Sequence, residues 1–143
     1  MLADQILDRK GRDVATIAPD STVRAAAEAL AAGNVGALVV SPDGSALVGI
    51  VSERDIVRRL AVDGPELLDQ PVATIMQAEV RTCAGSDHVD QLMELMTQHR
   101  IRHLPVVEGE ALAGIISIGD VVKTRVDELV TEKDQLVDYI RGG

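Results

Sequence analysis

The feature that most constrains this chain is that its sequence repeats once. Residues 14–60 align with residues 80–125, with an offset of 66 before the turn at Asp43-Gly44 and 65 after it. Thirteen positions are identical, and in the first copy they are Thr16, Ala18, Val23, Glu28, Leu38, Val40, Ala46, Leu47, Gly49, Ile50, Ser52, Asp55 and Val57. Because polar residues match as well as aliphatic ones, the alignment indicates a duplicated unit instead of chance similarity between apolar segments.

Each copy is expected to fold as β-α-β-β-α. In the first copy, a short apolar run at 14–17 precedes a Pro-Asp-Ser-Thr turn rich in helix caps, and residues 23–32 have helical periodicity ending at Gly33-Asn34. Apolar runs at 37–40 and 47–51 flank a Ser-Pro-Asp-Gly turn typical of a hairpin, and residues 52–60 return to helical periodicity. The predicted fold class is therefore α/β (α+β), built from two such repeats.

The predicted organisation has five parts: an amino-terminal helix and lead-in at 1–13, the first repeat at 14–62, a linker at 63–79, the second repeat at 80–125 and a helical extension at 126–143. The amino-terminal helix is expected over residues 2–7. The final helix is expected to carry an apolar stripe: Val122, Val126, Leu129, Leu136 and Ile140. Either the amino-terminal helix or the same helix of a second subunit could cover this stripe. A homodimer is favoured because closed two-fold pairs are the commonest assembly.

Composition excludes several classes of protein. The chain has a net charge of −9, one aromatic residue (Tyr139) and one cysteine (Cys83). Proteins that stack bases on aromatic rings need side chains that this chain lacks, and its charge opposes a phosphate backbone. A lone cysteine fits a reducing compartment, no apolar run is long enough to span a membrane, and the first residues are unlike a signal peptide. We therefore expect a cytoplasmic protein that binds neither nucleic acid nor membrane.

The most distinctive repeated string is Gly-apolar-apolar-Ser-x-x-Asp, at residues 49–55 and 114–120. A serine at the end of a strand can cap the next helix, and an aspartate in that helix's first turn is favoured by the free N–H groups. A carboxylate at this place can also accept hydrogen bonds from the two hydroxyls of a ribose. On chemistry alone, a capping box between the serine and the aspartate is the commoner arrangement and is favoured.

This string, duplicated within a β-α-β-β-α unit, resembles the tandem cystathionine β-synthase (CBS) domain module. The resemblance covers residues 14–125, includes the strand threonines and the segment 102–107, and is greatest to small stand-alone bacterial members. It implies that the two repeats pack head to tail about a pseudo-two-fold axis, with two clefts between them. It also implies a regulatory module that binds an adenosine-containing ligand, such as AMP, ADP, ATP, NAD or S-adenosylmethionine. The module would signal occupancy to a partner protein or dimer interface.

The resemblance also implies which residues contact the ligand. The motif carboxylates would accept hydrogen bonds from the ribose, with the motif serines beside ribose or phosphate: Ser52, Asp55, Ser117 and Asp120. The segments that lead into each repeat would hold the adenine edge through a threonine and the neighbouring backbone: Thr16, Ile17, Thr82 and Cys83. With Tyr139 outside both repeats, the adenine would lie between aliphatic side chains.

The residues that open the second strand differ between the copies. In the second copy they are Arg102 and His103, followed by Pro105, and the resemblance implies that they reach a phosphate. The matching Gly36 and Ala37 carry no charge, which predicts two unequal clefts without showing which one favours phosphate. The cluster of Arg54, Arg58 and Arg59 follows the first motif; Arg54 either contacts the ligand or pairs with a surface carboxylate.

The sequence also bears on three other functional classes: a metal site, an enzyme and an interaction module. His99 and His103 have a spacing that forms a zinc pair only on one helix, and a strand is expected from Leu104, so no metal site is expected. Cys83 is expected to be a small buried apolar residue. No nucleophile–base arrangement or phosphate-binding glycine loop is present, so an enzyme is not expected. The alternative to a ligand sensor is a protein-interaction or dimerisation module with degenerate clefts, which Gly36 and Ala37 favour.

Overall fold

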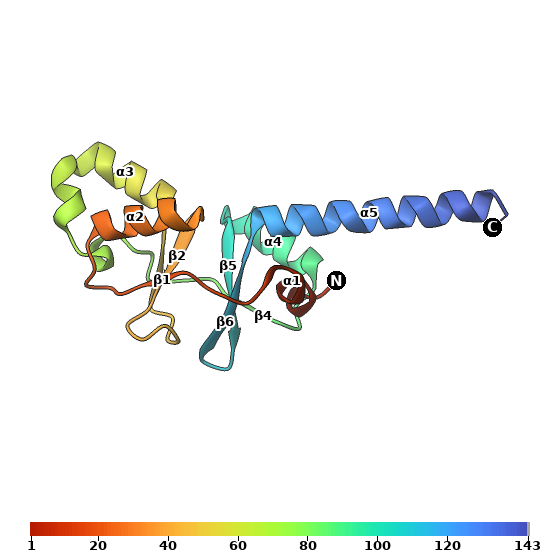
Figure 1. Cartoon of the computed structure of the whole chain (residues 1–143), viewed down its shortest axis with the longest axis horizontal. Coiled ribbons are helices and arrows are strands. Elements are labelled where there is room, and N and C mark those ends of the chain that lie inside the picture. Colours follow the sequence, from red (N-terminus) through yellow and green to blue (C-terminus); the bar gives the residue numbers. More distant parts are fainter. Residues whose placement is uncertain (143) are drawn as a thin grey trace.

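The structure is a computed structural model of the 143-residue chain and describes residues 1–142. Two repeats of β-α-β-β-α follow one another, as the sequence predicts (Figure 1). The first consists of β1 (Thr16–Ile17), α2 (Val23–Gly33), β2 (Ala37–Val40), β3 (Gly49–Ser52) and α3 (Glu53–Asp63). The second consists of β4 (Cys83–Ala84), α4 (Val89–His99), β5 (His103–Glu108), β6 (Ala111–Ser117) and α5 (Ile118–Ile140). The mixed α+β class is thereby confirmed.

Each repeat forms its own three-stranded sheet, with the order β1-β2-β3 in the first and β4-β5-β6 in the second. The first two strands of each sheet are parallel and the last two are antiparallel. The predicted strand at 47–51 begins only at Gly49. The loop before it is held in another conformation, because the backbone N–H groups of Ser45 and Ala46 donate to Asp43 Oδ1 at 2.9 and 2.8 Å.

The ends of the helices follow from their local sequence. Thr22 caps α2 by accepting a hydrogen bond from the backbone N–H of Ala25 at 3.1 Å, and α2 ends where Asn34 adopts a left-handed conformation with φ of 48°. In the second repeat, His88 is the cap of α4, and Arg100 is the left-handed residue after it, with φ of 52°. The predicted stop at Gly33-Asn34 is thus confirmed.

The segments that precede the repeats are exchanged between them. α1 (Ala3–Lys10) comes before the first repeat, yet its buried residues Ala3, Ile6 and Leu7 belong to the core of the second repeat. The linker comes before the second repeat and forms two 3₁₀ helices, Pro65–Asp69 and Val72–Thr74, that pack into the core of the first. Each hydrophobic core is therefore completed by the lead-in of the other repeat.

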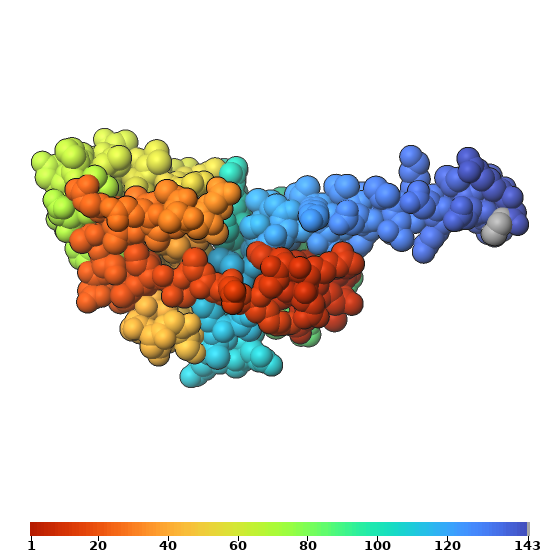
Figure 2. Space-filling model, viewed as in Figure 1, coloured from red at the N-terminus to blue at the C-terminus, as the bar shows by residue number. Residues whose placement is uncertain are grey.

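The helix α5 extends well beyond its own repeat, and its outer part stands clear of the rest of the molecule (Figures 1 and 2). The expected apolar stripe is exposed, at 49% for Leu129 and 59% for Leu136. The prediction that α1 could cover the stripe is wrong, because α1 buries its apolar face in the second repeat's core. Within residues 1–142, no helix combines the length and the apolar character that crossing a membrane requires.

Candidate functional site

The two repeated motifs occupy equivalent places, where β3 runs into α3 and where β6 runs into α5. Both form the capping box. The backbone N–H of Asp55 donates to Ser52 Oγ at 3.1 Å, and Asp55 Oδ2 accepts from the backbone N–H of Ser52 at 2.9 Å. In the second repeat the same two bonds join Asp120 and Ser117 at 3.2 and 2.9 Å. Each box uses Oδ2, and a carboxylate has about four acceptor sites, so the cap leaves capacity for a further donor.

The glycine that opens each motif has a structural reason that the sequence analysis missed. A Cβ at Gly49 would lie 2.5 Å from Met76 Sδ and 3.1 Å from the carbonyl oxygen of Gln77. A Cβ at Gly114 would lie 2.7 Å from Leu7 Cδ1. In both repeats the glycine thus lets the lead-in of the other repeat cross the motif strand at close range. The two glycines align in the sequence, and this is the signal that could have indicated a shared close approach.

The cleft beside Asp55 is formed by both repeats. Gln77 pairs through its backbone with Ile50, at 3.0 and 2.9 Å, and its Nε2 donates to Asp55 Oδ1 at 3.1 Å. Next to this contact is a cavity of about 280 Å³. Its lining comes from the motif strand of the first repeat, the lead-in of the second and the start of β5: Ile50, Gln77, Glu79, Val80, Arg81, His99, Ile101 and His103. The cavity therefore lies between Gln77, the bonded partner of Asp55, and a group of basic side chains.

His103 and Gly36, which belong to the two predicted strand openings, meet across the interface between the repeats. A Cβ at Gly36 would lie 3.3 Å from the His103 ring, so the absence of a side chain at Gly36 makes room for the imidazole. Burial, together with the positive charge of Lys10, lowers the pKa of His103 against the opposing effect of Glu53 and Asp120. The ring is therefore neutral near pH 7 and is able to gain a proton when an anion comes close.

Asp120, the carboxylate of the second motif, is bonded to a cation from α1. Lys10 Nζ donates to Asp120 Oδ2 at 2.6 Å and to the carbonyl oxygen of Ile115 at 2.9 Å. Burial works against ionisation of Asp120, but hydrogen bonds from Lys10 and Ser117 outweigh it and lower the pKa of this carboxyl group. Lys10 was not among the residues predicted from the sequence, because it lies outside the aligned repeats.

The other predicted contact residues are placed as follows. Ala37 is buried at the start of β2, while Thr16 on β1 is exposed and Ile17 is buried. Thr82 is half-buried just after the cavity-lining residue Arg81, and Pro105 is buried in β5, opposite Ile115. Arg54 and Arg102 are exposed. Apart from His103, none of the predicted contact residues lines the cavity itself, although Asp55 is bonded to its lining.

Chemistry at Cys83 and at the histidines follows from burial and position. Burial, together with the charge of Asp87, raises the pKa of Cys83 to about 12, so its thiol stays protonated. His99 ends α4 and His103 opens β5, so they lie on different elements as expected, although both line the same cavity. In residues 1–142, no three side chains of His, Cys, Asp or Glu converge in an arrangement that could hold a metal ion.

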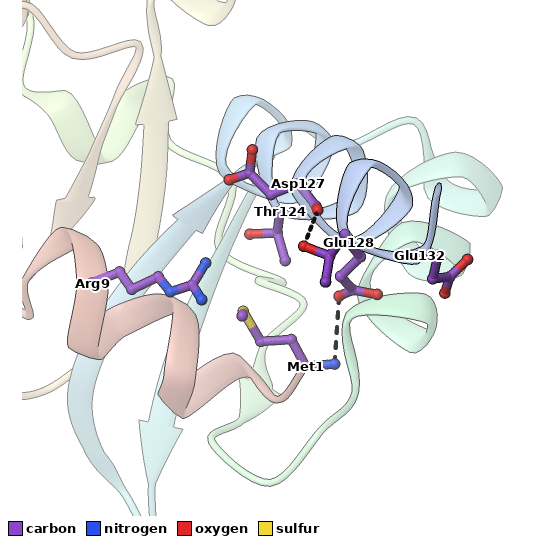
Figure 3. A pocket seen from close by; sticks show the side chains of 7 residues that line it. Met1, Arg9, Thr124, Asp127, Glu128 and Glu132 are labelled. Carbon is purple, nitrogen blue, oxygen red and sulfur yellow. Dashed lines mark hydrogen bonds and ion pairs between the residues drawn. The ribbon is translucent and has the colours of Figure 1, made fainter. Parts of the chain in front are cut away.

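A second cavity, of about 310 Å³, lies between α1 and α5 (Figure 3). It is lined by Met1, Arg9, Thr124, Asp127, Glu128, Thr131 and Glu132. The amino group of Met1 lies 3.5 Å from Glu128 Oε1 and 3.0 Å from His88 Nε2. None of the predicted site residues takes part in this cavity, but its contacts show that α1 meets α5 near Met1 as well as at Lys10.

Comparison with known proteins gives one consistent result. The family model described as CBS domain matches the chain twice, at residues 7–62 and 72–127. These two ranges contain the predicted repeats and part of each lead-in. Among curated proteins, the chain is 41% identical over 128 residues to the mitochondrial CBS domain-containing protein CBSX3 of Arabidopsis thaliana. The match covers 87% of this chain but only 62% of the plant protein's length.

Solved structures agree with the sequence matches. The CBS-domain containing protein ATU1752 from Agrobacterium tumefaciens has a TM-score of 0.85 at 47% identity, over 87% of this chain and 99% of that one. The CBS domain protein PAE2072 from Pyrobaculum aerophilum, solved in complex with AMP, has a TM-score of 0.75 at 32% identity. That match covers 84% of this chain and 89% of the other.

Proposed function

The chain belongs to the CBS domain family, and on that basis we propose that it is a sensor of adenosine nucleotides whose principal site is the cleft beside Asp55. One observation carries the proposal. A single cavity of about 280 Å³ is lined by Gln77, which is hydrogen-bonded to Asp55, and by the basic residues Arg81, His99 and His103. The AMP complex of the relative from Pyrobaculum aerophilum supports the choice of ligand class.

The proposed binding mode follows from the lining. The ribose hydroxyls donate to the carboxylate of Asp55 and replace the amide of Gln77 on Oδ1. The adenine lies against the aliphatic side chains of Ile50, Val80 and Ile101, since neither repeat contains Phe, Tyr or Trp. The phosphate lies near His103 and the arginines beside it, where anionic charge is favoured. The proposal thereby assigns phosphate binding, which the sequence left open between the two clefts, to the Asp55 cleft.

Isothermal titration calorimetry of the intact chain tests this proposal with AMP, ADP, ATP, NAD and adenosine. We expect AMP to bind the wild-type protein and Asp55→Asn to weaken it about tenfold or more, because an amide cannot accept from two hydroxyls as a carboxylate does. Asp63→Asn is the matched control, since Asp63 lies on the same helix and pairs with Arg59 at 2.9 Å, outside the cavity lining. Absence of binding by every compound at millimolar concentration would contradict the proposal.

The function proposed is binding without chemistry. The thiol of Cys83 is buried and protonated, so it offers no nucleophile. A ligand acts on such a module only through different affinities for two arrangements of the repeats, and α5 leads from the second motif towards a partner. We also propose that the protein works in the cytoplasm, where a lone cysteine stays reduced.

A second proposal concerns assembly: α5 forms a homodimer with the α5 of another copy. The exposed residues Val126, Leu129, Leu136 and Ile140 occupy a and d positions of a heptad, and Lys133 occupies the remaining a position. β-branched residues at a with leucine at d favour two-stranded pairing, and a single lysine at a fixes its register.

Light scattering after size-exclusion chromatography tests the dimer. We expect the wild type to elute with the mass of two chains and Leu129→Glu to elute with that of one, because a charge in the apolar seam opposes pairing. Val62→Glu is the control, because Val62 is 80% exposed on α3 and lies outside the stripe. A monomeric wild type at micromolar concentration would rule out this assembly.

A further inference from the structure

We propose that Lys10 is an internal competitor that occupies the second cleft, so that the chain takes its first adenosine ligand at Asp55 and a second only when Lys10 is released from Asp120. The inference rests on the proposed function, because it assumes that the motif carboxylates receive a ribose. It goes further by assigning a role to α1, which lies outside both predicted repeats.

Lys10 donates two hydrogen bonds to the second motif. Its ammonium group holds Asp120 Oδ2 at 2.6 Å and the carbonyl oxygen of Ile115 at 2.9 Å. Both acceptors belong to the second motif strand and its helix, and Asp120 is the carboxylate that a ribose would need. A side chain bonded to both occupies the place from which a ribose hydroxyl would donate to Asp120.

α1 is packed firmly against the second repeat, so the backbone of Lys10 is held in place. Leu7 is fully buried and packs against Gly114 so closely that a Cβ there would lie 2.7 Å from it. The backbone N–H of Ala3 donates to the carbonyl of Asp87 at 2.8 Å, and that of Asp4 donates to the carbonyl of Gly85 at 2.9 Å. The backbone of Lys10 is therefore already in place, and only its side chain has to be ordered when it binds Asp120, which favours the closed contact.

The first cleft differs in the group that contacts its motif carboxylate. There the equivalent contact to the carboxylate is made by Gln77, a neutral amide, and it is longer, at 3.1 Å. Both bonds have a carboxylate acceptor, but the ammonium group of Lys10 adds a full positive charge that the amide of Gln77 lacks, so the attraction to the carboxylate is stronger at Asp120. A ribose hydroxyl is neutral, so it replaces the amide of Gln77 more readily than the ammonium of Lys10.

The surroundings of the two motif carboxylates also differ in their basic residues. Positions Arg81, His99 and His103 of the first cleft correspond, at the offset of 66, to Ala15, Gly33 and Ala37. These three positions of the first repeat therefore offer no basic group that could attract a phosphate when Lys10 is displaced. His103 itself lies within electrostatic reach of Lys10 and Asp120, and the charge of Lys10 opposes its protonation. A nucleotide that displaces Lys10 from Asp120 therefore gains less than one that displaces the neutral amide of Gln77.

Release of Lys10 has a consequence for α5. Asp120 lies in the first turn of α5, and the amino group of Met1 lies 3.5 Å from Glu128 on the same helix. α1 and the preceding Met1 are thus attached to α5 at two places, and Figure 3 shows the contact of Met1 with Glu128. A second ligand that displaces Lys10 removes one of these attachments, so occupancy of the second cleft is signalled through α1 to the helix proposed to mediate assembly.

The test is a pair of reciprocal exchanges in the intact chain. Lys10→Gln gives the second cleft the neutral partner of the first, and Gln77→Lys does the reverse. Calorimetry with AMP and with adenosine is expected to show one tight site per chain in the wild type. In Lys10→Gln we expect the second site to bind with about tenfold higher affinity than the second site of the wild type. In Gln77→Lys we expect the affinity of the first site to fall by a similar factor.

A second measurement requires no ligand. Hydrogen exchange of the backbone amides at the end of α1 and the start of α5 should become faster in Lys10→Gln, because one attachment of α1 has been removed. Arg9→Gln is the matched control: it removes one positive charge from the same turn of α1, and within residues 1–142 Arg9 forms no ion pair.

The outcomes separate the two proposals. Two equally tight sites in the wild type, or a single site in Lys10→Gln, would overturn the role of Lys10 and leave the nucleotide sensor intact. Unchanged hydrogen exchange in Lys10→Gln would also overturn it. If neither AMP nor adenosine binds any variant, the proposed function fails, and the competitor role fails with it.

Discussion

Asp55 accepts a hydrogen bond from the amide of Gln77 at 3.1 Å, whereas Asp120, its counterpart in the second repeat, accepts one from the ammonium group of Lys10 at 2.6 Å. The carboxylates, capping serines and motif strands are otherwise equivalent. The difference comes from the lead-ins, which lie outside the matched core of the repeats and cross to the opposite half. Duplication thus fixed the position of each carboxylate, and the exchanged segments determine what each carboxylate binds.

The largest expected effect tests whether α1 is a structural part of the second repeat. Leu7→Ala should lower the free energy of unfolding by about 2–5 kcal/mol, because it removes a fully buried side chain from that core. Urea unfolding followed by circular dichroism measures the change. Gly114→Ala alone should also destabilise, since its Cβ would meet Leu7. The double variant should be less unstable than the sum, because the new methyl group enters the space that Leu7 leaves; simple additivity would show that the two residues do not interact.

The next effect tests the electrostatic difference between the clefts. A phosphate beside His103 should raise the lowered pKa of this imidazole towards its ordinary value of 6.5, so binding of AMP should take up protons near and below that pH. Calorimetry in buffers of different ionisation enthalpy measures this uptake. Adenosine is the control ligand, because it carries no phosphate, and His103→Gln is the control variant. Equal proton uptake with AMP in the wild type and in His103→Gln would place the phosphate elsewhere.

A smaller effect concerns stability in acid. The pKa of Asp120 is lowered in the folded protein, so its contribution to stability is fully present above the ordinary value of 3.8 and is lost as the pH falls through the folded value. Below about pH 4, the free energy of unfolding of Asp120→Asn should therefore change less with pH than that of the wild type. Asp55→Asn should change this dependence less, because Lys10 pairs only with Asp120. Identical acid profiles for the two variants would remove the contrast between the clefts.

The smallest effect is expected at Arg54. This side chain is exposed, and within residues 1–142 it forms no ion pair, so Arg54→Gln should change stability by less than about 0.5 kcal/mol. If Arg54 attracts the phosphate, the variant should weaken AMP binding slightly and leave adenosine binding unchanged. Titration with both ligands distinguishes these cases. A clear loss of stability would indicate a structural role that the observed contacts do not explain.

Much of the fold could be predicted because its determinants are local. The repeat, the hairpin turn, the cap at Thr22 and the stop at Asn34 all depend on residues close in sequence. The capping boxes were expected for the same reason. Placing Lys10 on Asp120 was beyond the sequence, because 110 residues separate them and α1 has no counterpart in the aligned region. Likewise, the strand expected from Leu104 indicated that His99 and His103 would diverge, yet both line one cavity.

The exchange of lead-ins also determines whether one repeat can fold without the other. A single repeat made with its own lead-in would leave its core open, since the apolar residues that close it come from the other half: Ala3, Ile6 and Leu7 for one, Leu67, Val72 and Ile75 for the other. Two separate copies of one repeat would close both cores by trading these segments, as swapped dimers do. The present chain is such a pair joined into one molecule, and its linker makes the trade independent of protein concentration.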